Sequence, residues 1–340
     1  MPNDIVTRAI DAAASGNHLT ADHASAVLAE IMEGRSDEVQ TGAFLIALRT
    51  KGETVPELIG LARTMRSLAA PVEVSGVLVD TAGTGGGPST FNVSTTAALV
   101  AAAAGCQVAK HGNRSSTSLS GSADLLEALG VNIELEPERV AASIEETGFG
   151  FMFAPKHHKA MAHVVPVRKA LAVRTIFNFL GPLTNPAGAK RQLVGVSDRR
   201  YQETIAEALV GLGTERALVV AGEDGLDEVT ITGPTRMIEV VDGGTREEFV
   251  APEDFGFERA ELGDVAGGTP AENAAATRAV LEGEKSPRRD LVLLNAAAAI
   301  YVGGGADDFT GGVEAATEAI DSGSAAAMLA RLVSFTGRDR

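Results

Sequence analysis

A glycine-rich loop at residues 81–93 has the composition of an anion-binding site. It follows a short apolar segment, residues 77–80, and leads into a helix expected from Ser94. Glycines let a backbone approach an anion closely, and a helix N-terminus presents free N–H groups to it. The loop lacks the Gly-Lys-Ser/Thr of a Walker A loop, and Pro88 breaks the GxGxxG spacing. It therefore predicts a phosphate site of another kind, with a flexible surface turn as the alternative.

A second polar loop follows at residues 110–118. It begins Lys110-His111-Gly112-Asn113-Arg114 and continues with four hydroxyl residues. Ammonium, guanidinium, imidazole, amide and hydroxyl groups all donate hydrogen bonds to phosphate or carboxylate oxygens. If both loops end neighbouring parallel strands, they line one crevice at the edge of the sheet. Ordinary loop polarity is the alternative, and the lack of a nearby acid argues against it.

Acidic residues are missing from the segments that carry these loops. Neither residues 81–123 nor residues 147–197 contain an Asp or Glu, although the chain has 45 acidic and 29 basic residues and a net charge of −16. The same segments hold most of the candidate donors: Lys110, Arg114, Lys156, Lys159, Arg168, Lys169, Arg174, Lys190, Arg191 and four histidines. Chance and buried alanine-rich helices offer one explanation. We favour a site for a highly charged anion, from which carboxylates are excluded.

Asp227-Glu228 forms a carboxylate pair shortly after the expected strand at residues 217–221. Oxygen ligands of this kind hold Mg²⁺, which is commonly shared with substrate phosphates. Such a pair in a loop is often only a solvated turn. Beside a phosphate site, the pair predicts metal-assisted chemistry on a diphosphate.

The elements that must position these residues fall into two groups. Apolar spacing predicts four helices in the first seventy residues, at 5–14, 20–33, 37–50 and 54–68, with caps at Thr20, Ser36 and Thr54. Short strands then alternate with helices: strands at 77–80, 107–109, 132–135, 149–153, 192–196 and 217–221, and helices at 94–104, 122–129, 137–147, 157–172, 201–212, 271–281, 288–301 and 313–332. This pattern predicts an α/β fold. We expect a small helical domain (residues 1–70, joined by about 157–185) and a larger α/β domain (71–340), whose mostly parallel central sheet is covered by helices.

Composition narrows the class of protein. The chain has 340 residues, and its single cysteine, Cys106, allows neither an intrachain disulfide nor a cysteine-built zinc site. The acidic balance disfavours binding to nucleic acid or to an anionic membrane. No signal peptide or membrane span is expected, so the sequence predicts a cytoplasmic protein.

Taken together, the motifs resemble the anthranilate phosphoribosyltransferase family over nearly the whole chain. The residues that carry the resemblance are GTGG at 83–86, 92–95, 110–115, 120–124, 153–155, 167–169, 175–178, 181–186 and Asp227-Glu228. The resemblance implies a homodimer with its active site between the two domains. It also implies Mg²⁺, about two ions per site. The implied reaction joins anthranilate, through its amine, to 5-phosphoribosyl-1-diphosphate (PRPP) and releases pyrophosphate, in tryptophan biosynthesis.

The resemblance also implies roles for individual residues. PRPP would be held by Gly83, Gly86, Asn92, Ser94, Thr95 and Lys110, with Ser94 facing one magnesium and Asp227 and Glu228 holding the second. Anthranilate would be lined by His111, Asn113, His158 and Arg168, with Arg168 facing the carboxylate and Gly181 in the turn that closes the site. Further expected substrate-binding residues are Thr84, Gly85, Thr90, Val93, Gly112, Arg114, Ser115, Ser116 and Ser122.

Three of these residues are the catalytic candidates: His111, Asn113 and Arg168. Displacing pyrophosphate builds positive charge on the sugar and negative charge on the leaving group, so metal, N–H donors and positioning supply most of the acceleration. An aromatic amine needs no strong base, although a neutral His111 could accept its proton at pH 7.

The chain departs from the family pattern in its glycine loop. The family usually reads GTGGD, but here Gly87 replaces the Asp and the loop is one residue shorter. We expect an altered magnesium optimum, with activity kept because Asp227 and Glu228 remain. Ala172 is a smaller departure, because relatives often carry Gly there.

Two other functions remain as alternatives. Pyrimidine nucleoside phosphorylases are similar in architecture, but they carry a Lys- and Ser-containing glycine loop that this chain lacks. A non-catalytic paralogue that binds nucleic acid is disfavoured by the net charge and by the intact Asn113, Arg168 and Asp227-Glu228.

Overall fold

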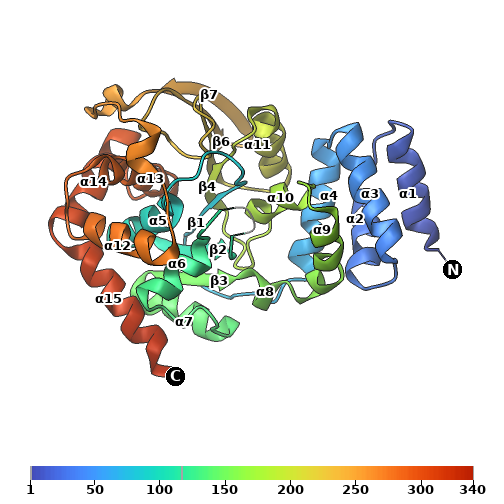
Figure 1. Ribbon diagram of the computed structural model, residues 1–340, viewed down its shortest axis with the longest axis horizontal. Helices are drawn as coiled ribbons and strands as arrows, with labels where there is room; N and C mark the ends of the chain where they lie inside the picture. The colour runs from blue at the N-terminus through green and yellow to red at the C-terminus, as the bar shows by residue number, and fades with distance from the viewer. Residues whose placement is uncertain (1, 116–117, 340) are drawn as a thin grey trace.

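Four helices open the chain and pack together at one end of the molecule (Figure 1). The computed structural model describes residues 2–115 and 118–339. The first helices are α1 (Asp4–Ala14), α2 (Ala21–Met32), α3 (Glu38–Lys51) and α4 (Val55–Ser67). Thr20 caps α2 through the His23 N–H, whereas α3 is capped by Asp37 and not by Ser36, because the Asp37 carboxylate accepts the Gln40 N–H at 2.8 Å. The four predicted helices are confirmed.

A seven-stranded sheet forms the centre of the larger part, in the order β3-β2-β1-β4-β5-β6-β7. Its first five strands are parallel: β1 (Leu78–Gly83), β2 (Gln107–Gly112), β3 (Phe149–Phe153), β4 (Arg191–Gly195) and β5 (Arg216–Gly222). An antiparallel hairpin, β6 (Thr235–Val241) and β7 (Gly244–Val250), extends one edge and was not predicted. Its two turn residues, Asp242 and Gly243, both have positive φ, as tight hairpins require.

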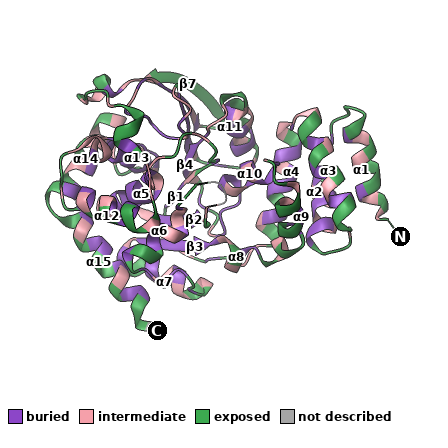
Figure 2. Ribbon diagram, viewed as in Figure 1, coloured by how far each residue is buried: buried purple, intermediate pink, exposed green. Residues whose placement is uncertain are grey.

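Helices cover both faces of the sheet. Those of the larger part are α5 (Val93–Ala103), α6 (Ser122–Leu129), α7 (Pro137–Thr147), α8 (Ala154–His157), α11 (Gln202–Gly211), α12 (Pro270–Leu281), α13 (Pro287–Gly303), α14 (Phe309–Asp321) and α15 (Ser324–Thr336). Short 3₁₀ turns lie at Lys159–His163, Gly181–Leu183, Arg199–Tyr201, Pro252–Phe255, Leu262–Val265 and Gly337–Asp339. Figure 2 shows that burial is greatest on the parallel strands β1–β5 and on α5 and α13, whereas β7 is exposed. The predicted α/β fold with its separate helical part is confirmed.

Three predicted elements differ from the structure. Residues 132–135 pair with no strand, and Ile133 and Leu135 are buried because their side chains belong to apolar cores that include both helices and strands. The helix predicted at 157–172 is broken into a 3₁₀ turn and α9 (Val165–Leu171), with Pro166 in the first turn of α9. The helix predicted at 313–332 is two helices, because Gly323 adopts a left-handed conformation between them.

The two sides of the sheet belong to different apolar cores. Leu193 and Leu218 face the core built around α5 and α13, whereas the alternate residues Val194 and Val219 face a core shared with α1–α4. The second core also includes residues of α9 and of α10 (Phe177–Leu180). The connection from β3 to β4 therefore contributes to the helical part. No helix within 2–115 or 118–339 has the length and apolar character of a membrane span.

Candidate active site

The predicted loops meet at one edge of the sheet. Strands β1, β2, β3, β4 and β5 run parallel, so the segments that follow them emerge on the same side. The strand order changes direction between β1 and β4, and ligands of open α/β sheets bind beside such a point. The glycine loop leaves β1 at this position.

The glycine loop is held by contacts from the end of β4 and from the segment after β5. The Thr84 N–H donates to the Gly195 carbonyl at 2.9 Å, and the Gly85 N–H donates to the Asp227 carboxylate at 2.8 Å. Ser197 adds two bonds, from its N–H to the Thr84 hydroxyl and from its hydroxyl to the Gly85 carbonyl. Gly83 must lack a side chain, because a Cβ there would lie 2.3 Å from the Asp227 carboxylate. The loop is therefore built into the edge of the sheet, and the flexible surface turn is excluded.

Lys110 lies beneath this loop and is fully buried. Its ammonium donates to the carbonyl and the hydroxyl of Thr81 and lies 3.4 Å from the Ser94 hydroxyl. Burial lowers the Lys110 pKa to about 8, and the nearby Asp80 carboxylate partly opposes that effect. An anion above Ser94 would therefore meet a positive charge that is already desolvated.

Asn92 begins α5 and connects three segments. Its side-chain oxygen accepts bonds from Ser120 and Asn273, both at 2.9 Å, and its amide donates to the Ser120 carbonyl. Val93 and Thr95 are buried in the first turn of α5, and the Thr95 hydroxyl has no partner. Asn92 stands at the N-terminus of α5, and its side chain joins this end of the helix to the segments of Ser120 and Asn273.

Asp227 and Glu228 approach the glycine loop from the segment after β5. Glu228 is buried; one oxygen accepts the Thr90 hydroxyl at 3.3 Å and the other has no partner. Burial raises the pKa of both carboxyls, and the Asp227 charge raises the pKa of Glu228 further. An unpartnered buried oxygen in a crowded carboxylate pair is suited to a hard divalent cation.

Mg²⁺ fits these residues. Across residues 2–115 and 118–339 no group of three or more His, Cys, Asp or Glu side chains is placed to hold a metal. Mg²⁺ in proteins is often bound by one or two carboxylates, with water and substrate phosphates completing its octahedron. The pair therefore matches an ion that is shared with a diphosphate substrate.

His111 and His158 lie together on the side of the site that faces the helical part. Their ring centroids are 5.0 Å apart, and the His111 Nδ1 lies 3.2 Å from the Gly181 carbonyl. Burial lowers the pKa of His111 to about 3 and that of His158 to about 4. A bond to a carbonyl requires Nδ1 to carry the proton, which leaves the unpartnered, buried Nε2 of a neutral His111 as an acceptor.

Arg168 contributes a cation from α9. Its guanidinium lies 5.5 Å from the centre of the Phe177 ring, and burial lowers its pKa. No carboxylate in the part of the chain that the structure describes forms an ion pair with it. A half-buried guanidinium beside an aromatic ring, with no ion pair among the described residues, is suited to an aromatic carboxylate.

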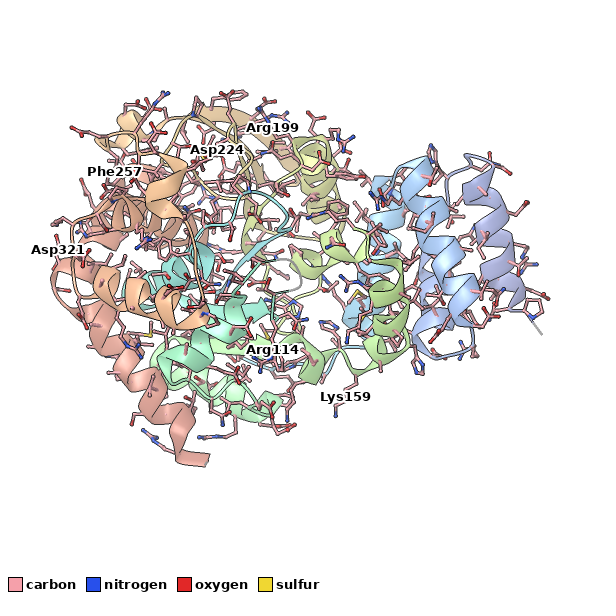
Figure 3. The ribbon with its side chains drawn as sticks, viewed as in Figure 1. Arg114, Lys159, Arg199, Asp224, Phe257 and Asp321 are labelled. Atoms are coloured by element: carbon pink, nitrogen blue, oxygen red, sulfur yellow. The ribbon has the colours of Figure 1, made fainter. Side chains whose placement is uncertain are left out.

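The second polar loop is less available to an anion than its sequence indicates. Arg114, labelled in Figure 3, pairs with Asp124 and Glu127 of α6 at 2.9 and 2.5 Å. The prediction that no acid balances this loop is therefore wrong for Arg114, because α6 supplies both carboxylates. Asn113 is exposed and its side-chain oxygen accepts the Arg114 N–H.

The rest of that loop lies around the start of α6. The Ser115 N–H donates to Asp124, and Gly112 packs closely against Ser122 and Phe151, where a Cβ would meet them at 3.1 and 2.7 Å. Ser116, a predicted substrate-binding residue, lies outside the described residues.

Several residues of the site were assigned no role from the sequence. Asp80, at the centre of β1, accepts the His111 N–H and the Asn185 amide, and so fixes the start of the second loop. Arg174 and Ser197 bind the glycine loop, and Asn273 supports Asn92. The surplus of cations at 147–197 indicated that the segment of Arg174 belongs to the site, but it did not indicate that Arg174 bonds to the glycine loop. Nothing in the sequence distinguishes Ser197 or Asn273 from other polar residues.

Comparison with known proteins agrees with this geometry. Residues 75–326 match the model of the glycosyl transferase family α/β domain, and residues 7–69 match that of its helical bundle domain. Anthranilate phosphoribosyltransferase from Thioalkalivibrio sulfidiphilus is 53% identical over 331 residues, covering 97% of this chain and 98% of that protein.

Solved structures extend the comparison to three dimensions. The crystal structure of anthranilate phosphoribosyltransferase from Thermus thermophilus superimposes with a TM-score of 0.92 at 47% identity, over 97% of this chain and 99% of that one. The Saccharomyces cerevisiae enzyme in complex with PRPP and Mg superimposes with a TM-score of 0.89 at 29% identity, over 98% of each chain. On the evidence of its two matched domains and of relatives aligned over nearly its full length, the chain belongs to the anthranilate phosphoribosyltransferase family.

Proposed function

We propose that the chain transfers the 5-phosphoribosyl group of PRPP to the amine of anthranilate and releases pyrophosphate, in the tryptophan pathway. One observation carries the proposal: the Gly85 N–H of the glycine loop bonds to the carboxylate of Asp227, beside the unpartnered oxygen of Glu228. A phosphate-binding loop and a magnesium-binding pair therefore form one site. Nothing observed favours a nucleoside phosphorylase or a nucleic-acid-binding protein.

The residues divide the work between the two substrates. The glycine loop, the start of α5 and Lys110 would bind the diphosphate and 5-phosphate oxygens through N–H groups, hydroxyls and one buried ammonium. Magnesium held by Asp227 and Glu228 would neutralise the charge of the leaving pyrophosphate. Arg168 would bind the anthranilate carboxylate and so aim the amine at the sugar carbon.

The proposal is tested by following anthranilate fluorescence with PRPP present and magnesium titrated from zero. A metal-dependent loss of signal that is absent without PRPP is the expected result. No loss from folded protein at any magnesium concentration would contradict the proposed activity.

His111 is expected to accept the amine proton without titrating in the assay range. Because burial lowers its pKa from 6.5 to about 3, the imidazole stays neutral from pH 5.5 to 8.5. His111→Asn should lower kcat by about tenfold, the small effect reflecting an amine that is already nucleophilic. The ratio of wild-type to variant kcat should be constant across that range, as measured under saturating substrates. An unchanged kcat, or a ratio that falls towards one below pH 6.5, would contradict this role.

The Gly87 departure from the family pattern has a steric basis. A Cβ on Gly87 would lie 2.3 Å from the Gly225 carbonyl oxygen, so any side chain there requires the loop to shift. Gly87→Asp and Gly87→Asn should both raise the KM for PRPP several-fold. Only the Asp variant adds a charge, so its magnesium optimum should differ from that of the Asn variant. Equal optima, measured by magnesium titration at fixed PRPP, would refute the expected effect of the missing carboxylate.

The quaternary structure and the domains enter as further proposals. An apolar groove on the helical part, between α3 and α9, is lined by Val39, Gly42, Ala43, Ile46, Val167 and Leu171, and Val39 is 81% exposed. We propose that this surface pairs two copies as a homodimer, since soluble monomers seldom expose such a patch.

We also propose that residues 1–70 and about 157–185 act as one helical domain, supported by their common core. Two magnesium ions per site and a cytoplasmic location stay predictions.

A further inference from the structure

Arg174 makes a direct connection to the glycine loop from a segment far along the chain. It lies on the connector between α9 and α10, residues 172–176, and its guanidinium donates to two successive carbonyls. The Nη1 lies 2.6 Å from the Gly85 oxygen and the Nη2 3.2 Å from the Thr84 oxygen. The contact is close, because a Cβ on Gly86 would overlap the guanidinium. Only glycine at position 86 permits it.

The same connector is attached to the helical part. Arg49, in the last turn of α3, donates to the Arg174 carbonyl at 2.9 Å. The Arg174 guanidinium lies 5.7 Å from the ring centre of Phe179, which stacks on Tyr201. The Tyr201 hydroxyl in turn donates to Glu53 beside α3. Arg174 is thus held between the helical part and the loop.

These bonds determine which side of each loop peptide faces the site. In a trans peptide the C=O and the N–H point in opposite directions, and the described chain has no cis peptide bond. Arg174 holds the Thr84 carbonyl, so the Gly85 N–H points the other way, where it bonds to Asp227. Arg174 and Ser197 hold the Gly85 carbonyl, which turns the Gly86 N–H away from them. Two carbonyl dipoles that would repel an anion are thereby withdrawn.

We propose that Arg174 is a positioning residue for PRPP. It binds the carbonyls of Thr84 and Gly85. The Gly85 N–H is thereby turned towards Asp227, and the Gly86 N–H is turned towards the side on which the diphosphate would bind. The inference rests on the proposed function. It adds a route by which the helical part, through Arg49 and the connector, sets the conformation of the phosphate-binding loop. Arg174 itself does not touch the reacting atoms in this arrangement.

The test compares Arg174→Met with a matched arginine that bonds a carbonyl elsewhere. Arg66 of α4 is equally half-buried and donates to the Leu183 carbonyl at 2.7 Å, away from the glycine loop. We expect Arg174→Met to raise the KM for PRPP by about tenfold or more, with less than about twofold change in the KM for anthranilate. Arg174→Lys should recover part of the loss, since an ammonium can bond one carbonyl but not hold both in a fork. Arg66→Met should lower the melting temperature without the selective rise.

Calorimetric titration with PRPP and magnesium, in the absence of anthranilate, gives a second readout. Its Kd should rise in parallel with the KM in Arg174→Met. An unchanged Kd and KM for PRPP in folded Arg174→Met would overturn the inference. A variant in which kcat and the melting temperature fall while the KM for PRPP stays the same would also overturn it. If Arg174→Met does not fold, Ser197→Ala removes the other donor to the Gly85 carbonyl and should raise the same KM several-fold; no rise would be contrary evidence. Failure of the proposed function is distinct, because the wild-type protein would then show no magnesium-dependent loss of anthranilate.

Discussion

Glu228→Gln is expected to lower kcat/KM for PRPP by about 10³-fold, the largest effect of any single substitution considered for this chain. Glu228 is buried with one unpartnered oxygen, and its pKa is raised well above the ordinary value by burial and by Asp227. A neutral amide keeps the shape and the Thr90 contact but removes the charge that a divalent cation requires. The loss should be recovered in part by high magnesium, because the Asp227 carboxylate remains.

The measurement is a magnesium titration of initial rate at several pH values. Metal binding displaces protons from carboxyls of raised pKa, so the apparent magnesium affinity of the wild type should increase as pH rises. Glu223→Gln is the matched control, because Glu223 is exposed on the same loop and its carboxylate lies 3.9 Å from the guanidinium of Arg199. Wild-type magnesium dependence in Glu228→Gln would remove this carboxylate from the metal site.

Arg168→Met should lower kcat/KM for anthranilate by about 100-fold, mainly through a higher KM. The guanidinium is half-buried, and burial lowers its pKa. A charge-assisted bond to a carboxylate contributes about 1.5–3 kcal/mol, which corresponds to a loss of that order. Methionine keeps the packing of the side chain against Phe177.

A substrate without the carboxylate separates recognition from general damage. Aniline has no carboxylate for Arg168 to bind, so its weak reaction in the wild type should be nearly unchanged in Arg168→Met. Lys169→Met, at the exposed neighbouring position, serves as the charge-matched control. If aniline and anthranilate lose rate equally in Arg168→Met, the residue supports the fold of α9 and not the carboxylate.

The fold was largely predictable because local patterns dominate it. Thr54 and Glu57 form a capping box at α4, and β5 is a short, mostly apolar run that ends in glycine. Residues 132–135 alternate polar and apolar side chains, as a half-buried strand does, but no strand lies beside them to pair with. Sequence periodicity cannot reveal whether such a neighbour exists. The β6–β7 hairpin was missed because β7 is almost entirely exposed and therefore lacks an apolar pattern.

The candidate site was predictable where the residues that act together are neighbours in the sequence. The glycine loop, Lys110 and Asp227-Glu228 were found this way, and the structure places them together. Asp80 and Asn273 could not be found, because their partners are 31 and 181 residues distant. The prediction also failed at Arg114, because the acid-free segment ends at the start of α6, which supplies the two carboxylates.

The backbone geometry at Ala172 shows what this departure from the family pattern costs. Ala172 ends α9 with φ of 50°, a left-handed conformation that costs a non-glycine residue about 1–2 kcal/mol. A glycine at this position would have no such cost. The strained residue begins the connector that carries Arg174.

The apolar core that α1–α4 share with later segments cannot be completed until those segments have been synthesised. Val167, Phe177 and Leu183 pack in the same core as α1–α4, yet the ribosome makes them only after β1–β3. At roughly 5–20 residues per second, the interval of about 115 residues between α4 and Leu183 lasts roughly 6–23 seconds. During that time the nascent helices expose apolar surface that their own sequence cannot cover. Chaperone demand on this protein should therefore be greatest in the middle of translation and decline once β6, the last strand that contributes to this core, has left the ribosomal tunnel.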